Sequence, residues 1–341
     1  MQYKLLGRSG LKVSQLCLGT MGFGQATPWG INEADSFAIM EAFANAGGNF
    51  LDTANRYQNG QSEEIVGRFI NQTDRHYWVV ATKYSLYDNT TNPNASGNNR
   101  KNMMRSVEAS LRRLNTDFID ILYLHIWDWL TPMDEVLRGL DDLVRMGKVN
   151  YLAISDTPAW LVAQGQTMAQ LMGWSPFVAL QIEYSLLQRT PERDLIPMAQ
   201  HYGLTITPWA PLAGGALTGK YLLNNPGRIK EGSVRLNERA TAITKEVMTI
   251  AQQLGGTPAQ VALAWTMQQP VSSIPIAGAT KLSQLQDNLG ATTLKLPQTV
   301  IDHLNDISAI DLGFPGNFYK EDAVRFNNFG GFYQQVEKRI P

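Results

Sequence analysis

The stretch MMRSVEASLRRLNTDFIDILYLH, residues 103–125, contains a helical pattern that is followed at once by the pattern of a buried strand. In residues 103–114, charged and apolar residues alternate with a period near 3.6, which is typical of an amphipathic helix. The run of residues 118–125 is short and nearly continuously apolar, as expected of a parallel strand that is covered on both faces. Together they predict one helix–strand unit of an α/β fold.

The same unit recurs along the chain. Helical patterns are also found at residues 32–46 and 133–146, which are followed by Gly47-Gly48 and by Gly147, residues typical of helix C-termini. Seven further apolar runs have the length and composition of strands: 13–19, 49–53, 77–82, 149–155, 178–184, 204–210 and 271–277. Eight strands that alternate with helices predict parallel pairing with right-handed crossovers. We therefore predict an α/β fold, a (β/α)8 TIM barrel that forms a single domain over residues 1–341; an open doubly wound sheet is the alternative.

Two segments fall outside this repeat. Residues 211–237 are long, Gly-rich and polar, and a loop of that length in a compact domain is usually functional. The tail after Asp311 is rich in Phe, Tyr, Gly and Asn and has no clear periodicity. We expect extra loops and this C-terminal tail at the active-site face of the barrel.

Composition excludes several classes of protein. The 29 Lys and Arg against 30 Asp and Glu give a net charge of −1, which argues against a nucleic-acid partner, because such a partner needs a basic face. The single cysteine, Cys17, excludes an intrachain disulfide and fits a reducing compartment. No secretory signal pattern and no stretch near the ~20 apolar residues of a membrane span is present. We expect a soluble cytoplasmic protein without a membrane partner, and we assign no metal site; an oligomer is left open.

Ionisable residues follow three consecutive predicted strands at their C-terminal ends. Asp52 lies at the end of the second strand and Tyr57 in the loop after it, Lys83 follows the third strand, and His125 ends the fourth. Active sites of such barrels lie at this end, and neighbouring strands are about 5 Å apart, so the four side chains can converge. Taken singly, each has a plainer interpretation as a helix cap, a packed tyrosine, a surface lysine or a core histidine.

The four residue types together suit proton delivery to a carbonyl oxygen. A phenol, with a pKa of about 10, is a poor acid at neutral pH, and a nearby ammonium lowers that pKa. A carboxylate keeps the ammonium charged and oriented, and an imidazole can hydrogen-bond the substrate oxygen. We therefore predict that Asp52, Tyr57, Lys83 and His125 are catalytic and that Tyr57 is the proton donor when a carbonyl receives a hydride.

An ordered series of motifs resembles the aldo-keto reductase superfamily over essentially the whole chain. The motifs are GRSGLKVSQLCLGTMGFG (7–24), LDTANRY (51–57), ATK (81–83), RSVEASLRRLNTDFIDILYLHIWD (105–128), LVRMGKVNYLAISD (143–156), QIEYSLLQR (181–189), PWAPLAGGALTGKY (208–221) and GATKLSQLQDNLGA (278–291). The resemblance implies NADP(H)-dependent reduction of aldehydes or ketones to alcohols. It places the family's catalytic tetrad on the same four residues, Asp52, Tyr57, Lys83 and His125.

The resemblance also implies a cofactor that lies extended across the barrel mouth. The matching positions are Gly19, Thr20 and Met21 in the turn after the first strand, Asp52, then Ser155, Asp156 and Gln181 at the nicotinamide carboxamide, Trp209 stacked on the nicotinamide, Ala210, Pro211, Leu212, Gly214, Leu217, Lys220 and Arg235 at the pyrophosphate, and Gly278, Thr280, Lys281, Gln284 and Asn288 at the adenosine and its 2′-phosphate.

Three of these positions depart from the usual family residue. Asp156 replaces Asn, and a carboxylate accepts hydrogen bonds but cannot donate one to the carboxamide oxygen. Ala210 replaces a common Ser, and Gln284 stands at a position that is Arg in some branches and Gln in others. Fewer cations near the 2′-phosphate weaken the preference for NADP(H), so NAD(H) stays an alternative cofactor.

Aromatic residues near the strand ends suggest the substrate. Phe23, Trp29, Trp127 and Trp129 are candidate pocket walls, together with aromatic residues of the tail, unless they only pack against one another. Apolar walls suit aromatic or hydrophobic carbonyl substrates.

Two rival functions are carried forward. One is NAD(P)-linked oxidation of a secondary alcohol or sugar, in which Tyr57 would act as a base. The other is a cofactor-binding regulatory subunit, like the potassium-channel β subunits that share the resemblance. That branch lacks the histidine after the fourth strand, whereas His125 is present here.

Overall fold

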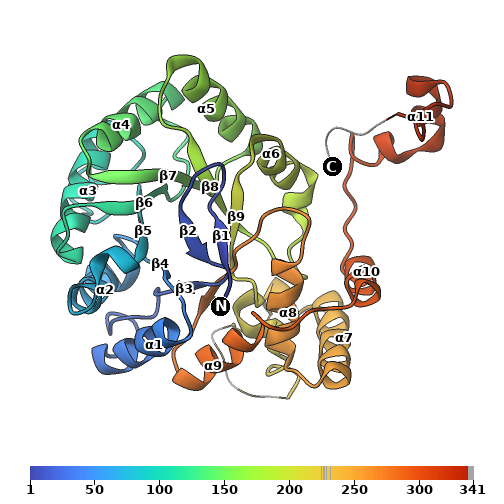
Figure 1. Cartoon of the computed structure of the whole chain (residues 1–341), viewed down its shortest axis with the longest axis horizontal. Coiled ribbons are helices and arrows are strands. Elements are labelled where there is room, and N and C mark those ends of the chain that lie inside the picture. Colours follow the sequence, from blue (N-terminus) through green and yellow to red (C-terminus); the bar gives the residue numbers. More distant parts are fainter. Residues whose placement is uncertain (224, 226, 228, 231, 337–341) are drawn as a thin grey trace.

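Eight parallel strands form the centre of the molecule, with helices around them (Figure 1). The computed structural model describes residues 1–223, 225, 227, 229–230 and 232–336. The strand order is β10-β3-β4-β5-β6-β7-β8-β9, and each neighbouring pair is parallel. The strands are β3 (Cys17–Gly19), β4 (Phe50–Asp52), β5 (Val79–Tyr84), β6 (Ile119–Leu124), β7 (Val149–Ser155), β8 (Phe177–Glu183), β9 (Thr205–Trp209) and β10 (Ile276–Gly278).

The two ends of this sheet meet, so the sheet is a nearly closed barrel. The Ile206 amide of β9 donates to the Ser272 carbonyl at 2.8 Å, and the Ile274 amide donates to the Ile206 carbonyl at 2.9 Å. The segment before β10 thereby lies beside β9, while β10 itself pairs with β3. The predicted (β/α)8 barrel is confirmed, and an open doubly wound sheet is excluded.

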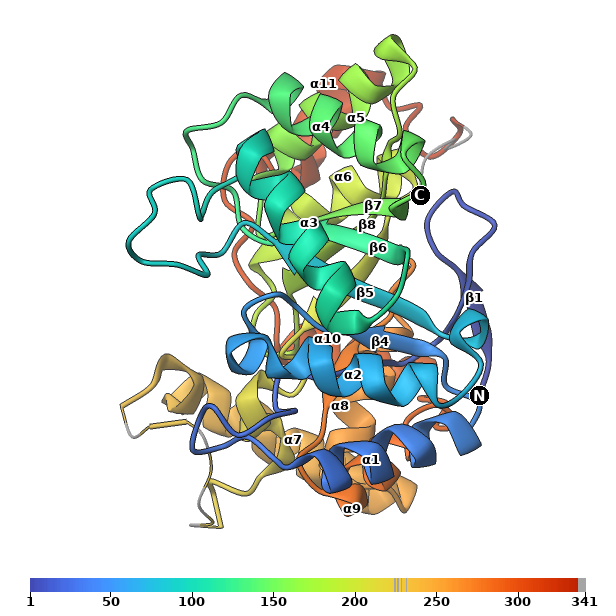
Figure 2. The same ribbon diagram turned by 90° about the vertical axis from the view of Figure 1, so that its left-hand side faces the viewer.

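Helices surround the barrel on its outside (Figures 1 and 2). They are α1 (Glu33–Asn45), α2 (Gln61–Asn71), α3 (Arg100–Leu114), α4 (Met133–Arg145), α5 (Ala159–Met172), α6 (Leu195–Tyr202), α7 (Glu238–Leu254), α8 (Pro258–Met267), α9 (Leu282–Gly290) and α10 (Gln298–Ile307). A further helix, α11 (Asp322–Phe329), lies on the C-terminal tail, away from the barrel. Within the part of the chain that the structure describes, none of the helices has both the length and the apolar character needed to cross a bilayer.

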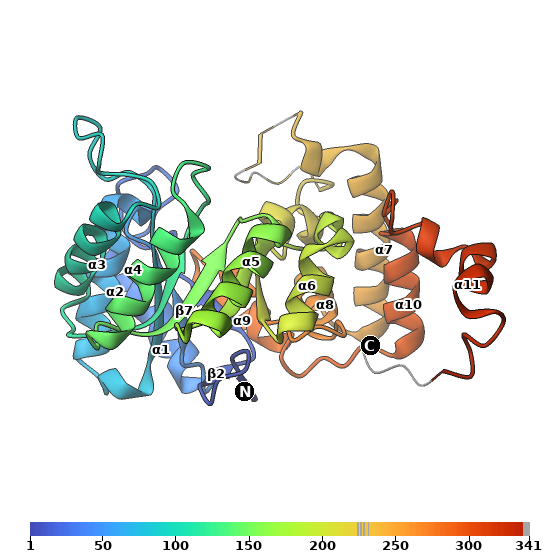
Figure 3. The same cartoon turned by 90° about the horizontal axis from the view of Figure 1, so that it is seen from above.

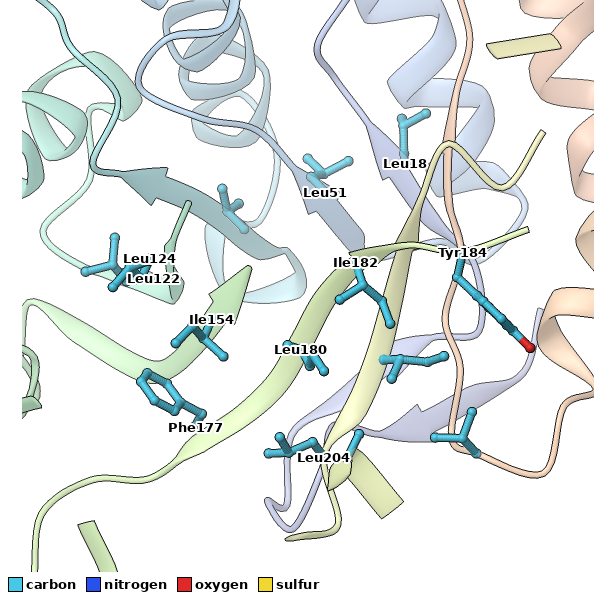
Figure 4. Close-up of a cluster of buried hydrophobic side chains, with 14 of the residues drawn as sticks. Leu18, Leu51, Leu122, Leu124, Ile154, Phe177, Leu180, Ile182, Tyr184 and Leu204 are labelled. Atoms are coloured by element: carbon cyan, nitrogen blue, oxygen red, sulfur yellow. The ribbon is translucent and has the colours of Figure 1, made fainter. Parts of the chain in front are cut away.

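Strand side chains alternate between the barrel interior and the surrounding helices. Leu18 and Leu51 belong to a cluster that includes helix residues, and Figure 4 shows them with Leu122 in that layer. Their neighbours Cys17 and Phe50 belong to a second cluster of strand residues. Because both faces are buried, the strands are apolar at nearly every position, which explains the continuous runs in the sequence.

The first predicted strand, residues 13–19, is divided in the structure. Its beginning belongs to β2 (Lys12–Ser14), which pairs with β1 (Tyr3–Leu5) as an antiparallel hairpin, and only β3 enters the barrel. The chain bends after Ser14, whose amide donates to Asn49 Oδ1 at 2.7 Å and whose hydroxyl donates to the Leu16 carbonyl.

The C-terminal tail differs from the expectation that it covers the active-site face. It leaves α10 and runs sideways away from the barrel, with α11 at its far side (Figures 1 and 3). Its aromatic side chains are largely exposed, among them Phe314, Tyr319, Phe326 and Phe332. In the structure these aromatics therefore contribute no wall to a pocket at the barrel mouth.

Candidate active site

Lys83, on β5, lies at the centre of a buried hydrogen-bonded group. Its Nζ atom donates to Asp52 Oδ1 at 2.5 Å, to the Thr53 carbonyl oxygen at 2.8 Å and to Tyr57 Oη at 3.2 Å. An ammonium has three N–H donors, so these contacts use all of them. The structure thus brings Asp52, Tyr57 and Lys83 together at the C-terminal ends of β4 and β5.

The same contacts determine the protonation of the group. Burial by itself lowers the pKa of Lys83, but Asp52 and Tyr57 outweigh burial, so the pKa of Lys83 is raised and its charge is kept. Burial raises the pKa of Tyr57, and Lys83 offsets this only in part. The sequence argument expected Lys83 to lower this pKa. The pKa of Tyr57 is raised overall because the loss of hydration destabilises the phenolate more than the charge of Lys83 stabilises it.

His125, directly after β6, faces the ring of Tyr57. The two ring centroids are 6.0 Å apart, with an interplanar angle of 80°. Burial, and to a lesser extent the charge of Lys83, lowers the pKa of His125 to about 3. The imidazole is therefore neutral at physiological pH, and its Nδ1 atom has no hydrogen-bond partner among the described residues.

The loop that carries Tyr57 is anchored at its next residue. Gln58 is buried, and its amide group donates to the Met21 carbonyl and to Thr27 Oγ1 while accepting from the Thr27 amide. Gln58 and Asn59 both have left-handed backbone angles, with φ of 49° and 57°. Such angles are costly for residues other than glycine and persist only where surrounding contacts hold them. The anchored loop fixes the position of Tyr57.

The nicotinamide-site residues predicted from the sequence lie at the ends of β7, β8 and β9. Ser155 and Gln181 are register partners, and Ser155 Oγ is buried without a hydrogen-bond partner among the described residues, which fits a ligand group at this point. Gln181 Nε2 donates to Asp52 Oδ2 at 2.9 Å, so this amide supports the Asp52 carboxylate. Asp156 Oδ1 accepts from Trp209 Nε1 at 3.0 Å and thereby orients the indole.

Two cations and two glycines meet in the predicted pyrophosphate loop. Gly214 and Gly215 have φ of 69° and 94°. A Cβ at Gly215 would lie 3.0 Å from Lys220 Nζ, and one at Gly214 would lie 3.3 Å from a terminal nitrogen of Arg235, whose guanidinium also pairs with Glu183. Bare backbone next to two cations is a suitable cradle for phosphate.

The remaining predicted cofactor residues differ in accessibility. Gly19, Thr20, Pro211, Leu217 and Asn288 are buried, and Thr20 Oγ1 donates to the Asp52 carbonyl. Gln284 Oε1 accepts from the amide and hydroxyl of Thr280, so this side chain holds the loop before α9. Exposed or partly exposed positions are Met21, Ala210, Leu212, Gly278, Thr280, Lys281 and Gln284.

The four predicted pocket aromatics are not gathered in one wall. Phe23 is fully buried in the core and therefore does not line a pocket in the structure. Trp127 lines a cleft of about 680 Å³ between the loops after β5 and β6. Trp129 is 66% exposed, and Trp29 is half-buried on the loop after β3.

Comparison with known proteins identifies the family. Residues 15–309 match the model of the aldo/keto reductase family. The chain belongs to the aldo/keto reductase family. A norsolorinic acid reductase of Aspergillus flavus is 37% identical over 330 residues, which cover 94% of this chain and 84% of the relative.

Other aldo/keto reductase relatives are named for aryl alcohols. An aryl-alcohol dehydrogenase [NADP(+)] of Phanerodontia chrysosporium is 37% identical, with 90% of this chain and 85% of the relative covered. A putative aryl-alcohol dehydrogenase of Saccharomyces cerevisiae is 35% identical, with coverages of 93% and 89%. The family is therefore shown by both the family model and the relatives.

One residue that organises the mouth of this aldo/keto reductase was not among the sequence-predicted site residues. Asp128 accepts from the amides of Asn98, Leu130 and Thr131 and from Thr131 Oγ1, and these contacts tie the loop after β5 to the loop after β6. The only sequence signal is its place three residues after His125, because its partner Asn98 lies 30 residues away in the chain.

Proposed function

We propose that this aldo/keto reductase is an NADP(H)-dependent enzyme that reduces aldehydes or ketones to alcohols, with Tyr57 as general acid. The observation that carries the proposal is the Lys83 ammonium, which donates to both Asp52 and Tyr57 Oη in a buried site. Because Tyr57 Oη accepts from Lys83, its own O–H must point elsewhere and is available to a substrate oxygen. The bound cofactor would supply the hydride.

The protein residues then complete the reaction. Hydride addition turns the carbonyl oxygen into an alkoxide, which takes the Tyr57 proton, and the phenolate left behind lies beside the Lys83 ammonium. Neutral His125 can hydrogen-bond the carbonyl oxygen without competing for the role of acid. Because the pKa of Tyr57 is raised, Tyr57 keeps its proton, as a general acid requires.

Ser155, Asp156, Gln181 and Trp209 would form the nicotinamide site, and Lys220 with Arg235 the phosphate site. The support is the orphaned Ser155 hydroxyl and the glycine cradle between the two cations. We include NADP(H) because one relative carries NADP(+) in its name. Norsolorinic acid and aryl alcohols in the names of relatives make aryl carbonyls our proposed substrate class.

The sole cysteine, Cys17, is buried and fits a reducing, cytoplasmic setting.

The experiment is NADPH consumption with 4-nitrobenzaldehyde and a panel of aryl aldehydes and ketones. We expect Tyr57→Phe to lower kcat by about 10²-fold or more while the Kd for NADPH changes little. Tyr319→Phe, on the exposed tail, is the matched control and should retain wild-type kcat. Full activity of Tyr57→Phe would refute the acid role. No NADPH consumption across the panel would favour a regulatory subunit, and faster oxidation than reduction would favour a dehydrogenase.

A further inference from the structure

Arg56 directly precedes the proposed proton donor Tyr57 in the sequence and carries a positive charge on the loop after β4. It lies on the anchored loop between β4 and α2, and its guanidinium carbon is 4.6 Å from the centroid of the Tyr87 ring. One terminal nitrogen donates to Tyr87 Oη at 3.0 Å and the other donates to Asn59 Oδ1. The guanidinium is therefore held in place by an aromatic face and two neutral oxygens.

This cation has no acidic partner within the described part of the chain. Among the residues that the structure describes, no carboxylate lies within 4 Å of the Arg56 nitrogens. Asp88, the residue after Tyr87, is held by Arg105 through two hydrogen bonds of 2.7 and 2.8 Å. A guanidinium has five N–H donors, and the two contacts of Arg56 use two of them. Three donors of this cation therefore have no partner among the described residues and remain for a ligand.

The surroundings of Arg56 restrict what that ligand can be. Tyr87 also lines the cleft of about 680 Å³ together with Ile126, Trp127 and Leu130, which offers apolar surface beside the strand ends. Asp128 and Glu135 lie on the same cleft, where Asp128 is held by its four hydrogen bonds and Glu135 accepts from the Arg100 amide. These two carboxylates disfavour an anion on their side, so an anionic group belongs at the Arg56 side.

We propose that Arg56 is a specificity-determining residue that binds a carboxylate of the carbonyl substrate. The substrate class is then an aryl aldehyde or ketone that carries a carboxylate, an inference that rests on the proposed reductase function. A guanidinium binds a carboxylate through two parallel hydrogen bonds, and a partly buried site strengthens that pair. The carboxylate would add binding energy and orient the carbonyl group toward Tyr57.

The test compares 3- and 4-carboxybenzaldehyde with their neutral methyl esters. The wild type should have a higher kcat/KM for at least one acid than for its ester. Arg56→Gln should lower this acid-to-ester ratio at least tenfold, mainly through KM, and Arg56→Lys should retain part of it. The matched control is Arg112→Gln, which removes the same charge from the exposed outer surface of α3 and should leave the ratio unchanged.

Three results would overturn the proposal. The first is a wild type whose kcat/KM is higher for both esters than for the acids. The second is an acid-to-ester ratio of kcat/KM that is unchanged in Arg56→Gln. The third is an equal loss of kcat/KM for acids and esters that follows a raised Kd for NADPH.

If no aldehyde is reduced, the reductase function fails, and ligand binding alone then tests the role of Arg56. In that case tryptophan fluorescence should show that benzoate binds the wild type with NADP⁺ at least tenfold better than benzamide, and that Arg56→Gln loses this difference. Equal binding of benzoate and benzamide would refute the proposal.

Discussion

His125 makes the stability of the fold depend on pH. Burial, with a smaller contribution from Lys83, lowers the pKa of His125 from 6.5 to about 3. In the unfolded chain the imidazole binds a proton below about pH 6.5, whereas in the folded protein it stays neutral down to about pH 3. Between these values the unfolded state binds more protons, so the free energy of unfolding falls as the pH falls.

The size of this effect follows from the two pKa values. Each pH unit below the unfolded pKa costs up to about 1.4 kcal/mol until the folded pKa is reached. At pH 5, one and a half units below 6.5, the cost relative to pH 8 is about 2 kcal/mol. That is a considerable part of the free energy of unfolding of a typical domain, about 5–15 kcal/mol.

The assay is urea unfolding of the wild type and of His125→Asn at pH 8 and pH 5. Asn cannot titrate, so the variant should lose about 2 kcal/mol less than the wild type between these two pH values. Any packing cost of the substitution is present at both pH values and cancels in the difference. His201→Asn, which removes an exposed histidine, should behave like the wild type. Equal losses for the wild type and His125→Asn would refute the reasoning.

Two further substitutions test the packing of the barrel and the phosphate cradle. In Gly67→Ala the new Cβ would lie 2.6 Å from the Leu114 carbonyl oxygen, so we expect a loss of about 1–3 kcal/mol in urea unfolding. Gly10→Ala, with open space around its Cβ, should change stability by less than about 0.5 kcal/mol, and equal effects would contradict the packing argument. Lys220→Met should raise the Kd for NADPH about tenfold, with kcat preserved at saturating NADPH. Lys245→Met on the exposed surface of α7 is its control, and an unchanged Kd in Lys220→Met would remove this residue from the phosphate site.

The barrel and the position of the ionisable residues could be predicted from the sequence because strong local signals carry them. Strands buried on both faces are apolar at nearly every position, so β5 and β6 are recognisable as continuous runs. A polar residue at the end of such a run is conspicuous, as Asp52 is at the end of β4 and His125 after β6. Since the ends of parallel strands meet at one side of the barrel, their proximity follows from the fold.

Other features could not be predicted, because they depend on contacts between distant residues. The bend after Ser14 rests on Asn49, 35 residues away, and no local pattern separates β2 from β3. The link between Asp128 and Asn98 joins two loops in the same way. The tail after Asp311 has an aromatic composition that suits a pocket, yet its side chains are exposed beside the barrel, since composition does not specify which surface a segment contacts.

Burial also explains why the expected direction of the Tyr57 pKa was wrong, and it clarifies how the site would work. The charge of Lys83 alone would lower that pKa, but burial raises it more, so the phenol enters the reaction protonated. In the proposed mechanism, the phenolate left after proton transfer and the ammonium would attract each other in a site with little water, where such attraction is strongest. Lys83 would therefore contribute most after the proton leaves, which is the differential stabilisation that catalysis requires. Asp52 holds Lys83 in this position, and Gln181 holds Asp52, so a residue expected only at the cofactor also supports the proposed proton donor.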